Sequence, residues 1–302
     1  MNSTLTRWQA NALLLLAAAI WGSAFIGQVL GMAGMGPFGF TAVRFALGAL
    51  VVAPLAWREW RALRRAGHAA DRRDAATIAL LGTLTCAGVL LQQIGLQSTS
   101  VTHAGFLTAI YVPLVPLLGW WLHRRAPHAS VWPAVAGCLA GTWLLTGGGL
   151  PSAGSGDAWV LASAFPWAVQ VLLVGHAANR LRGPFVLACG QFTVCALLSL
   201  ALAASNETIS VDGLRLAAGA IVYTGILSVG LGLTLQVVAQ RAAHPAEAAI
   251  ILSSETVFAA LFGAWFFDER LSAQGWAGCA LILASILLVE LLPTARPRLA
   301  PR

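Results

Sequence analysis

The most constraining feature of this sequence is a succession of long apolar segments separated by short charged clusters. Ten such segments, each of roughly the 20 residues that a helix needs to cross a bilayer, cover residues 11–31, 37–57, 75–96, 102–123, 130–149, 156–177, 184–204, 214–239, 246–267 and 273–292. The chain is 58% hydrophobic and 10% charged, against roughly 25% charged residues in soluble domains. We therefore predict an all-α polytopic membrane protein with ten transmembrane helices.

The basic residues predict the orientation in the membrane. All eighteen are arginine. With the N-terminus inside and one crossing per segment, the inner side holds fifteen: Arg7, Arg58, Arg61, Arg64, Arg65, Arg72, Arg73, Arg124, Arg125, Arg180, Arg182, Arg241, Arg296, Arg298 and Arg302. The outer side holds only Arg215 and Arg270, and Arg44 lies within the second segment. This bias predicts cytoplasmic N- and C-termini, and the placement between apolar segments argues against nucleic-acid binding.

The two halves of the chain match at several points in the same order. Pro37 and Arg44-Phe45 match Pro184 and Gln191-Phe192, Trp21 matches Trp167, and Gln93 and Gln97 match Gln236 and Gln240. Because five helices per repeat is an odd number, the second repeat must enter the membrane from the opposite side. We therefore predict two inverted five-helix repeats, residues 1–150 and 151–302, around a central cavity, which is a recurring design of secondary transporters.

Several motifs resemble those of a transporter family. They are Trp21-Gly22-Ser23-Ala24-Phe25 with Arg44-Phe45 in the first half, and Ser254-Glu255-Thr256-Val257-Phe258 with Asp268-Glu269-Arg270-Leu271 in the second. On these residues, and over residues 10–292, the chain resembles EamA-type exporters of the drug/metabolite transporter (DMT) superfamily. The first half departs from the family pattern, since His123-Arg124-Arg125 stands where a Gly-Glu-Arg-like turn is usual. In the second half, Thr256 replaces a common proline.

The resemblance carries expectations about the cavity. It implies that the first, third, fourth, sixth, eighth and ninth helices line the cavity, and that the fifth and tenth brace it from the rear. The second helix is not expected to line it. Many members of the family export amino acids or other small metabolites, and the Trp-rich cavity helices are similar to those of the YddG type of amino-acid exporter.

Seven polar or aromatic residues are the candidates for substrate binding: Trp21, Gln93, Tyr111, Trp167, Gln236, Ser254 and Glu255. Trp21 and Trp167 hold mirrored central positions, where their rings pack either against substrate or against core and lipid. Gln93 and Gln236 are mirrored amides that either bind substrate or join helices. Tyr111 lies near mid-depth, and the repeat places it opposite Ser254.

Two charged residues, Arg44 and Glu255, lie deep within apolar segments, away from the segment ends. Glu255 lies near the bilayer midplane, where a carboxylate costs on the order of 2.5–3.5 kcal/mol, so it faces either a substrate ammonium, a coupled proton or a structural partner. Arg44 pairs with Glu255, binds a substrate carboxylate or snorkels, and the structural role is favoured. Glu247 and Glu290 lie near the inner ends of their helices and are expected to reach the interface.

The remaining motifs leave alternatives open. Pro113, Pro116 and Pro166 remove helix hydrogen bonds, so they are candidate hinges or static kinks. Gly137 and Gly141 permit a close helix contact, either within the chain or in a homodimer. The five cysteines lie in apolar segments without CxxC or Cys/His spacing, so we expect neither a metal nor a cofactor.

These observations predict a secondary transporter, and more narrowly an exporter, of small neutral or zwitterionic metabolites. Amino acids, aromatic ones included, are the favoured substrates, and a cationic drug exporter or another metabolite carrier is the alternative. No motif of an enzyme or an ATPase is present. The expected partners are a small-molecule substrate and the lipid bilayer, with the chain acting as a monomer or homodimer. Arginine-only basic composition is typical of GC-rich bacterial genomes and favours the bacterial inner membrane.

Overall fold

The computed structural model describes residues 5–68, 71–124, 126–147, 154–267 and 271–291, and every regular element in these ranges is a helix. The helices are α1 (Arg7–Met32), α2 (Pro37–Arg65), α3 (Arg72–Gly95), α4 (Val101–Thr108), α5 (Tyr111–His123), α6 (Val131–Leu145), α7 (Ser155–Leu181), α8 (Pro184–Asn206), α9 (Val211–Tyr223), the π-helix η1 (Thr224–Leu233), α10 (Thr234–Ala239), α11 (Pro245–Leu252), α12 (Glu255–Phe267) and α13 (Ala273–Leu291). Nine helical stretches of the described residues are long and apolar enough to cross a membrane, and α6 is a shorter tenth. The predicted all-helical membrane fold is therefore confirmed.

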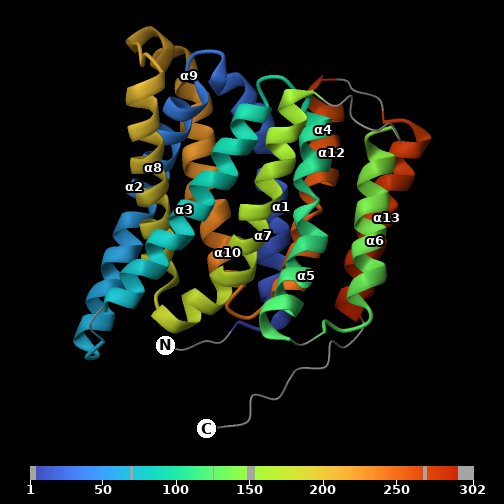
Figure 1. Ribbon diagram of the computed structural model, residues 1–302, viewed down its shortest axis with the longest axis horizontal. Coiled ribbons are helices and arrows are strands. Elements are labelled where there is room, and N and C mark those ends of the chain that lie inside the picture. The colour runs from blue at the N-terminus through green and yellow to red at the C-terminus, as the bar shows by residue number, and fades with distance from the viewer. Residues whose placement is uncertain (1–4, 69–70, 125, 148–153, 268–270, 292–302) are drawn as a thin grey trace.

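The two halves of the chain run in opposite directions through the bundle. α1 begins at the end that carries the N-terminus, and α7, its equivalent in the second half, begins at the opposite end (Figure 1). Equivalent helices of the two halves pack against each other, α2 along α8 and α6 along α13. We call the end where α1 begins the inner end. The expected boundary between the repeats, at residues 150 and 151, lies outside the described residues.

The fourth and ninth spans are interrupted at equivalent positions. The fourth consists of α4 and α5 and breaks at Ala109 and Ile110, whereas the ninth consists of α11 and α12 and breaks at Ser253 and Ser254. Pro113 explains the first break, because it has no N–H to donate to the carbonyl oxygen of Ala109 four residues earlier. Discontinuous helices at matching positions of two repeats are typical of transporter binding sites.

The eighth span shows that the symmetry is incomplete. Between α9 and α10, the ten residues of η1 form a π-helix, whereas the equivalent helix α3 is a regular α-helix throughout. Glycine occurs three times in this segment, at Gly225, Gly230 and Gly232. The wide turns of η1 distinguish the eighth span from the equivalent helix α3. Such π-helical turns occur frequently at functional sites.

Two glutamates tie α2 to α8, one near each end of the pair. The carboxylate of Glu207, just after α8, accepts hydrogen bonds from the backbone N–H groups of Phe38 (2.9 Å) and Gly39 (2.7 Å) in the first turn of α2. Reciprocally, Glu59 in α2 accepts one from Val186 (2.9 Å) in the first turn of α8. A carboxylate at a helix N-terminus satisfies free N–H groups and complements the helix dipole, so this pair forms a rigid part of the scaffold.

The small residues of α6 serve a contact within the chain. A Cβ on Gly141 would lie 2.7 Å from the carbonyl oxygen of Gly278 in α13, and one on Gly278 would lie 2.4 Å from that of Gly141. Gly137 faces Ser285 of α13. The close contact that Gly137 and Gly141 permit is therefore formed with α13.

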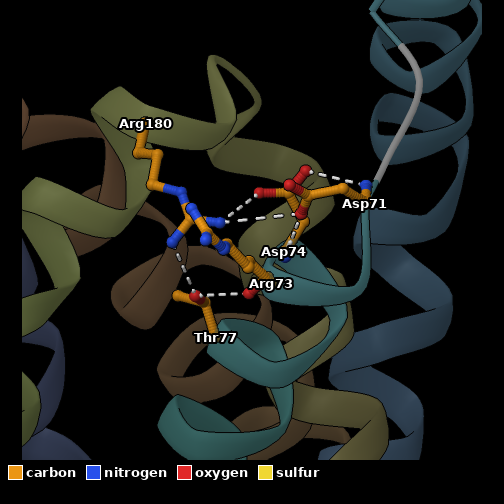
Figure 2. Close-up of polar contacts among 5 residues, drawn as sticks. All are labelled: Asp71, Arg73, Asp74, Thr77 and Arg180. Atoms are coloured by element: carbon orange, nitrogen blue, oxygen red, sulfur yellow. Dashed lines mark hydrogen bonds and ion pairs between the residues drawn. The ribbon is translucent and has the colours of Figure 1, made fainter.

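At the inner end, ion pairs connect the two halves. Arg180 near the C-terminus of α7 lies against the N-terminus of α3, where its guanidinium is 3.0 Å from the Asp74 carboxylate and 3.7 Å from that of Asp71 (Figure 2). The same guanidinium donates to the hydroxyl of Thr77 at 3.4 Å. Asp71 and Asp74 also cap the first turn of α3, so this ion pair joins two well-defined helix ends.

Candidate functional site

A cavity lies at the centre of the bundle, between the two halves. The centre of a water molecule can occupy a volume of about 70 Å³ in this cavity. This is several times the roughly 10–15 Å³ that is needed to hold one water. Its walls come from α1, α3, the broken α4–α5 and α11–α12 spans, α7, η1 and α10, as expected, and also from α2. The expectation that the second helix stays away from the cavity is therefore wrong, because Arg44 and Phe45 project into it.

Five aromatic side chains form much of the wall: Trp21, Phe25, Phe45, Tyr111 and Trp167. The two tryptophans occupy equivalent positions in α1 and α7, as the repeat predicts. Their indole N–H groups differ, because Trp21 donates to the carbonyl oxygen of Ser228 in η1 at 3.2 Å, whereas Nε1 of Trp167 is buried without a hydrogen-bond partner. A buried donor without a partner is costly, so Trp167 has an N–H to offer to a ligand.

Arg44 supplies a positive charge to the cavity. It is 3% exposed, and its guanidinium donates to the amide oxygens of Gln28 (3.3 Å) and Gln93 (3.2 Å). It also lies 5.2 Å from the ring centre of Phe40 and 5.5 Å from that of Phe45. Its Nε is buried and unpartnered. Neutral amides orient this cation without neutralising it, so Arg44 remains free to bind an anionic group.

Glu255 supplies a negative charge to the same cavity. It is the first residue of α12, directly after the break in the ninth span, and is 7% exposed. Among the described residues, its carboxylate has no hydrogen-bond or ion-pair partner. A buried charge normally requires one. A pairing with Arg44, one of the alternatives that the sequence leaves open, does not form, although both residues line the cavity.

The break in the ninth span places Glu255 at the start of α12, and Tyr111 holds the same place in the fourth span. Tyr111 and Glu255 are the first residues of α5 and α12, the helices that follow the two breaks, so Tyr111 is equivalent to Glu255. The sequence comparison, which paired Tyr111 with Ser254, is therefore wrong by one residue. The Tyr111 hydroxyl donates to the carbonyl oxygen of Ala249 in α11 at 3.4 Å, which connects the two broken spans directly.

Of the seven predicted binding residues, Trp21, Tyr111, Trp167, Gln236 and Glu255 line the cavity, and Gln93 and Ser254 do not. Gln93 lies behind Arg44 and accepts its hydrogen bond. The hydroxyl of Ser254 donates to the carbonyl oxygen of Ile251 at 2.7 Å, within its own break. Gln236 donates to Gln170 and Gln240 and keeps a buried, unpartnered Oε1. It therefore offers an acceptor to a ligand.

The candidate hinges lie in α5 and α7, two of the helices that contribute to the wall of this cavity. Pro113 belongs to the first turn of α5, Pro116 lies one turn further on, and Pro166 lies inside α7, one residue before Trp167. Only Pro113 coincides with a break in a helix. A hinge role for these prolines stays a prediction.

The sequence interpretation missed several polar wall residues. Gln28, Gln92, Thr108 and Ser228 all line the cavity. Gln92 donates to the Thr108 hydroxyl at 2.9 Å, which joins α3 to the broken fourth span. In an apolar segment these uncharged residues resemble the serines and threonines that only bond to their own helix. That they face one cavity becomes visible only when the helices are packed.

Comparisons with known proteins agree with this architecture. The model of the EamA-like transporter family matches residues 8–147 and again residues 154–291. An uncharacterized transporter of Archaeoglobus fulgidus is 28% identical over 285 residues, which are 94% of this chain and 87% of that protein. The uncharacterized transporter YwfM of Bacillus subtilis is 24% identical over 298 residues, 93% of each chain. A protein of known crystal structure is 18% identical, with a TM-score of 0.75, and the match covers 95% of this chain and 98% of that chain.

The fold and the cavity thus define a multi-pass membrane protein made of two inverted repeats around a central site. The chain belongs to the EamA-like transporter family, as its motifs predict, and this family lies within the drug/metabolite transporter superfamily.

Proposed function

We propose that this protein is a secondary transporter that exports small zwitterionic or neutral metabolites, with amino acids, aromatic ones included, as the substrate class. The observation that carries the proposal is the pair of opposite charges in one cavity. Arg44 and Glu255 both line it, do not pair with each other and are both almost fully buried. Burying unpaired charges is costly, and a zwitterion bound between them supplies a counter-charge for each.

The other wall groups fit the same ligand. A carboxylate accepts from the Arg44 guanidinium, which is suited to bidentate contacts, and from the unpartnered N–H of Trp167. An ammonium donates to Glu255 and to the free Oε1 of Gln236. The five aromatic rings then offer an apolar surface to the side chain. The cavity is small, so the substrates are metabolites of amino-acid size.

The broken spans support transport by alternating access. Glu255 and Tyr111 lie at the first residues of α12 and α5, so a small rotation of either half-helix moves a wall of the cavity. Because the repeats are inverted, equivalent rotations in the two halves open opposite faces of the membrane. We further propose the bacterial inner membrane as the location, with both termini cytoplasmic, residues 1–150 and 151–302 as the repeats, and a monomer or homodimer as the working unit.

Export of lipophilic cations is the second candidate. Glu255 and the aromatic rings favour it, because a carboxylate and π-faces attract cations. Arg44 in the same cavity opposes it, since a positive charge repels a cationic ligand in a region of low dielectric.

A matched set of ligands separates the two functions. Purified protein in liposomes, without ATP, should exchange a labelled amino acid across the membrane. Unlabelled amino acid should compete, whereas its methyl ester, a cation, and its N-acetyl derivative, an anion, should compete at least about tenfold less well, because each loses one charge partner. Absence of flux across an amino-acid and metabolite panel would refute the proposed function. Preference for the methyl ester would assign the protein to cation export.

A further inference from the structure

The two tryptophans of the cavity each lie directly against a glycine from the other half of the chain. Trp167 of α7 contacts Gly88 of α3, where a Cβ atom on the glycine would lie 2.9 Å from Cε2, 3.0 Å from Cδ2 and 3.1 Å from Nε1 of the indole. Trp21 of α1 contacts Gly232 of η1, where a Cβ atom would lie 2.7 Å from Nε1 and 3.2 Å from Cδ1. The indoles therefore occupy space that a side chain at either glycine would need.

The two contacts correspond to each other in the inverted repeat. Gly88 lies five residues before Gln93, and Gly232 lies four residues before the mirrored amide Gln236. Each glycine belongs to the third span of its own half and contacts the tryptophan in the first span of the other half. The same pair of residue types thus joins the halves twice, once in each direction.

The cavity is the space into which a displaced indole can move. Trp21 and Trp167 both line it, and elsewhere both rings pack against buried core residues, which are close-packed in proteins. Non-bonded carbon atoms have their optimal separation at about 3.5–4.0 Å. A methyl group on either glycine would therefore displace the indole by roughly 1 Å, and that displacement reduces the volume of the cavity.

The two rings differ in how firmly they are held. The indole of Trp21 donates to the carbonyl oxygen of Ser228, one turn before Gly232, at 3.2 Å, whereas Nε1 of Trp167 has no partner. Displacing Trp21 breaks a hydrogen bond, and displacing Trp167 breaks none. A substitution at Gly88 should therefore change the cavity with the smaller loss of stability.

We propose that Gly88 and Gly232 are positioning residues that set the size of the amino acid that the cavity accepts. Because neither has a side chain, the indoles lie back against α3 and η1, and the space that this leaves holds a bulky, aromatic side chain of the substrate. The preference for large substrates rests on the proposed transport function. The effect of the two glycines on the size of the cavity does not.

Competition between amino acids in liposomes measures the size preference. In Gly88→Ala, affinity for phenylalanine should fall about tenfold while affinity for alanine changes less than about twofold, because only the larger side chain overpacks the reduced cavity. Gly232→Ala should shift the ratio of the two affinities in the same direction, which keeps the test valid if Gly88→Ala does not fold. Gly82→Ala is the matched control in α3. A Cβ atom there would lie 2.5 Å from Val194 of α8, which does not line the cavity, so the ratio should stay as in wild type.

A smaller ring at position 167 should reverse the effect. In the double variant Gly88→Ala with Trp167→Phe, the ratio of phenylalanine to alanine affinity should return to that of Trp167→Phe alone. The loss of the indole N–H does not alter this ratio, because the N–H is offered to the carboxylate that all amino acids share. The proposal is overturned if Gly88→Ala and Gly232→Ala weaken both substrates equally, or shift the ratio no more than Gly82→Ala. Failure of Trp167→Phe to reverse the shift would also overturn it.

The cavity can also be measured without any transported substrate. Ser228 lines it, so Ser228→Cys in a full-length background without the native cysteines can be labelled with methanethiosulfonates of increasing size. Adding Gly88→Ala should slow the largest reagent at least about fivefold more than the smallest. This result without amino-acid flux in wild type would refute the proposed function and leave the role of the glycine in place. Equal rates with and without Gly88→Ala for every reagent would overturn that role.

Discussion

Arg44 in α2 and Gln191 in α8 occupy equivalent positions in the two repeats, yet they form different surroundings. Arg44 brings a charge to the cavity and is oriented by Gln28 and Gln93. Gln191 stays outside the cavity, where its Oε1 accepts from Gln170 and from Thr85, both at 3.4 Å. The two positions thus lie on equivalent helices of the repeats, whereas their charges differ. An inverted repeat needs symmetry to exchange conformations, but it needs asymmetry to bind a substrate that has a positive and a negative end.

The largest effect is expected from making the two positions alike. Arg44→Gln should lower kcat/KM for a transported amino acid about 100-fold, because a charge-assisted, bidentate contact with the carboxylate is lost. Flux in liposomes measures it, and size-exclusion chromatography verifies the fold. Arg44→Lys keeps the charge without the bidentate geometry, so its kcat/KM should lie between those of wild type and Arg44→Gln. Unchanged flux in Arg44→Gln would mean that the asymmetry has no role in binding.

The comparison of the two broken spans predicts the next effect. Glu255→Gln should weaken binding of amino acids about 30-fold, since the ammonium loses its charged acceptor, while N-acetylated analogues should bind no worse than to wild type. Ser254→Ala is the matched control, because this neighbouring hydroxyl bonds within its own span, to the carbonyl oxygen of Ile251. If Glu255 also couples protons, the pH dependence of flux changes in Glu255→Gln. An unchanged profile in a folded variant removes Glu255 from coupling.

The two equivalent tryptophans should separate binding from stability. Trp167→Phe removes an N–H without a protein partner and should weaken substrate affinity about fivefold. Trp21→Phe removes one that already bonds to Ser228, so it should lower the stability by about 1 kcal/mol and change affinity less than twofold. Titrations of substrate-dependent fluorescence and thermal unfolding curves measure both. Equal effects on affinity would show that the two indoles play the same part.

The sequence is sufficient to predict the spans, the inversion and the central position of Trp21, Trp167 and Glu255, because these follow from hydropathy, arginine placement and an odd number of helices. It is insufficient for Arg44, since the face of a helix that is apolar all round cannot be read from its period. Because of Pro113, the break in the fourth span can be predicted from the sequence, but the equivalent break at Ser253 contains no proline. The contacts of Arg7 with Glu247 and Glu290 join positions 240 and 283 residues apart, which only the packing of the folded helices brings together.

We propose that one cavity opens alternately to the two faces of the membrane. Ser228 lines the cavity from η1, so Ser228→Cys in a background without the five native cysteines places a thiol there with little change in volume. A membrane-impermeant thiol reagent should label it from the inside and from the outside of oriented vesicles, more slowly when a transported amino acid is present. Labelling from one side only, under all conditions of substrate and ion gradient, would contradict alternating access.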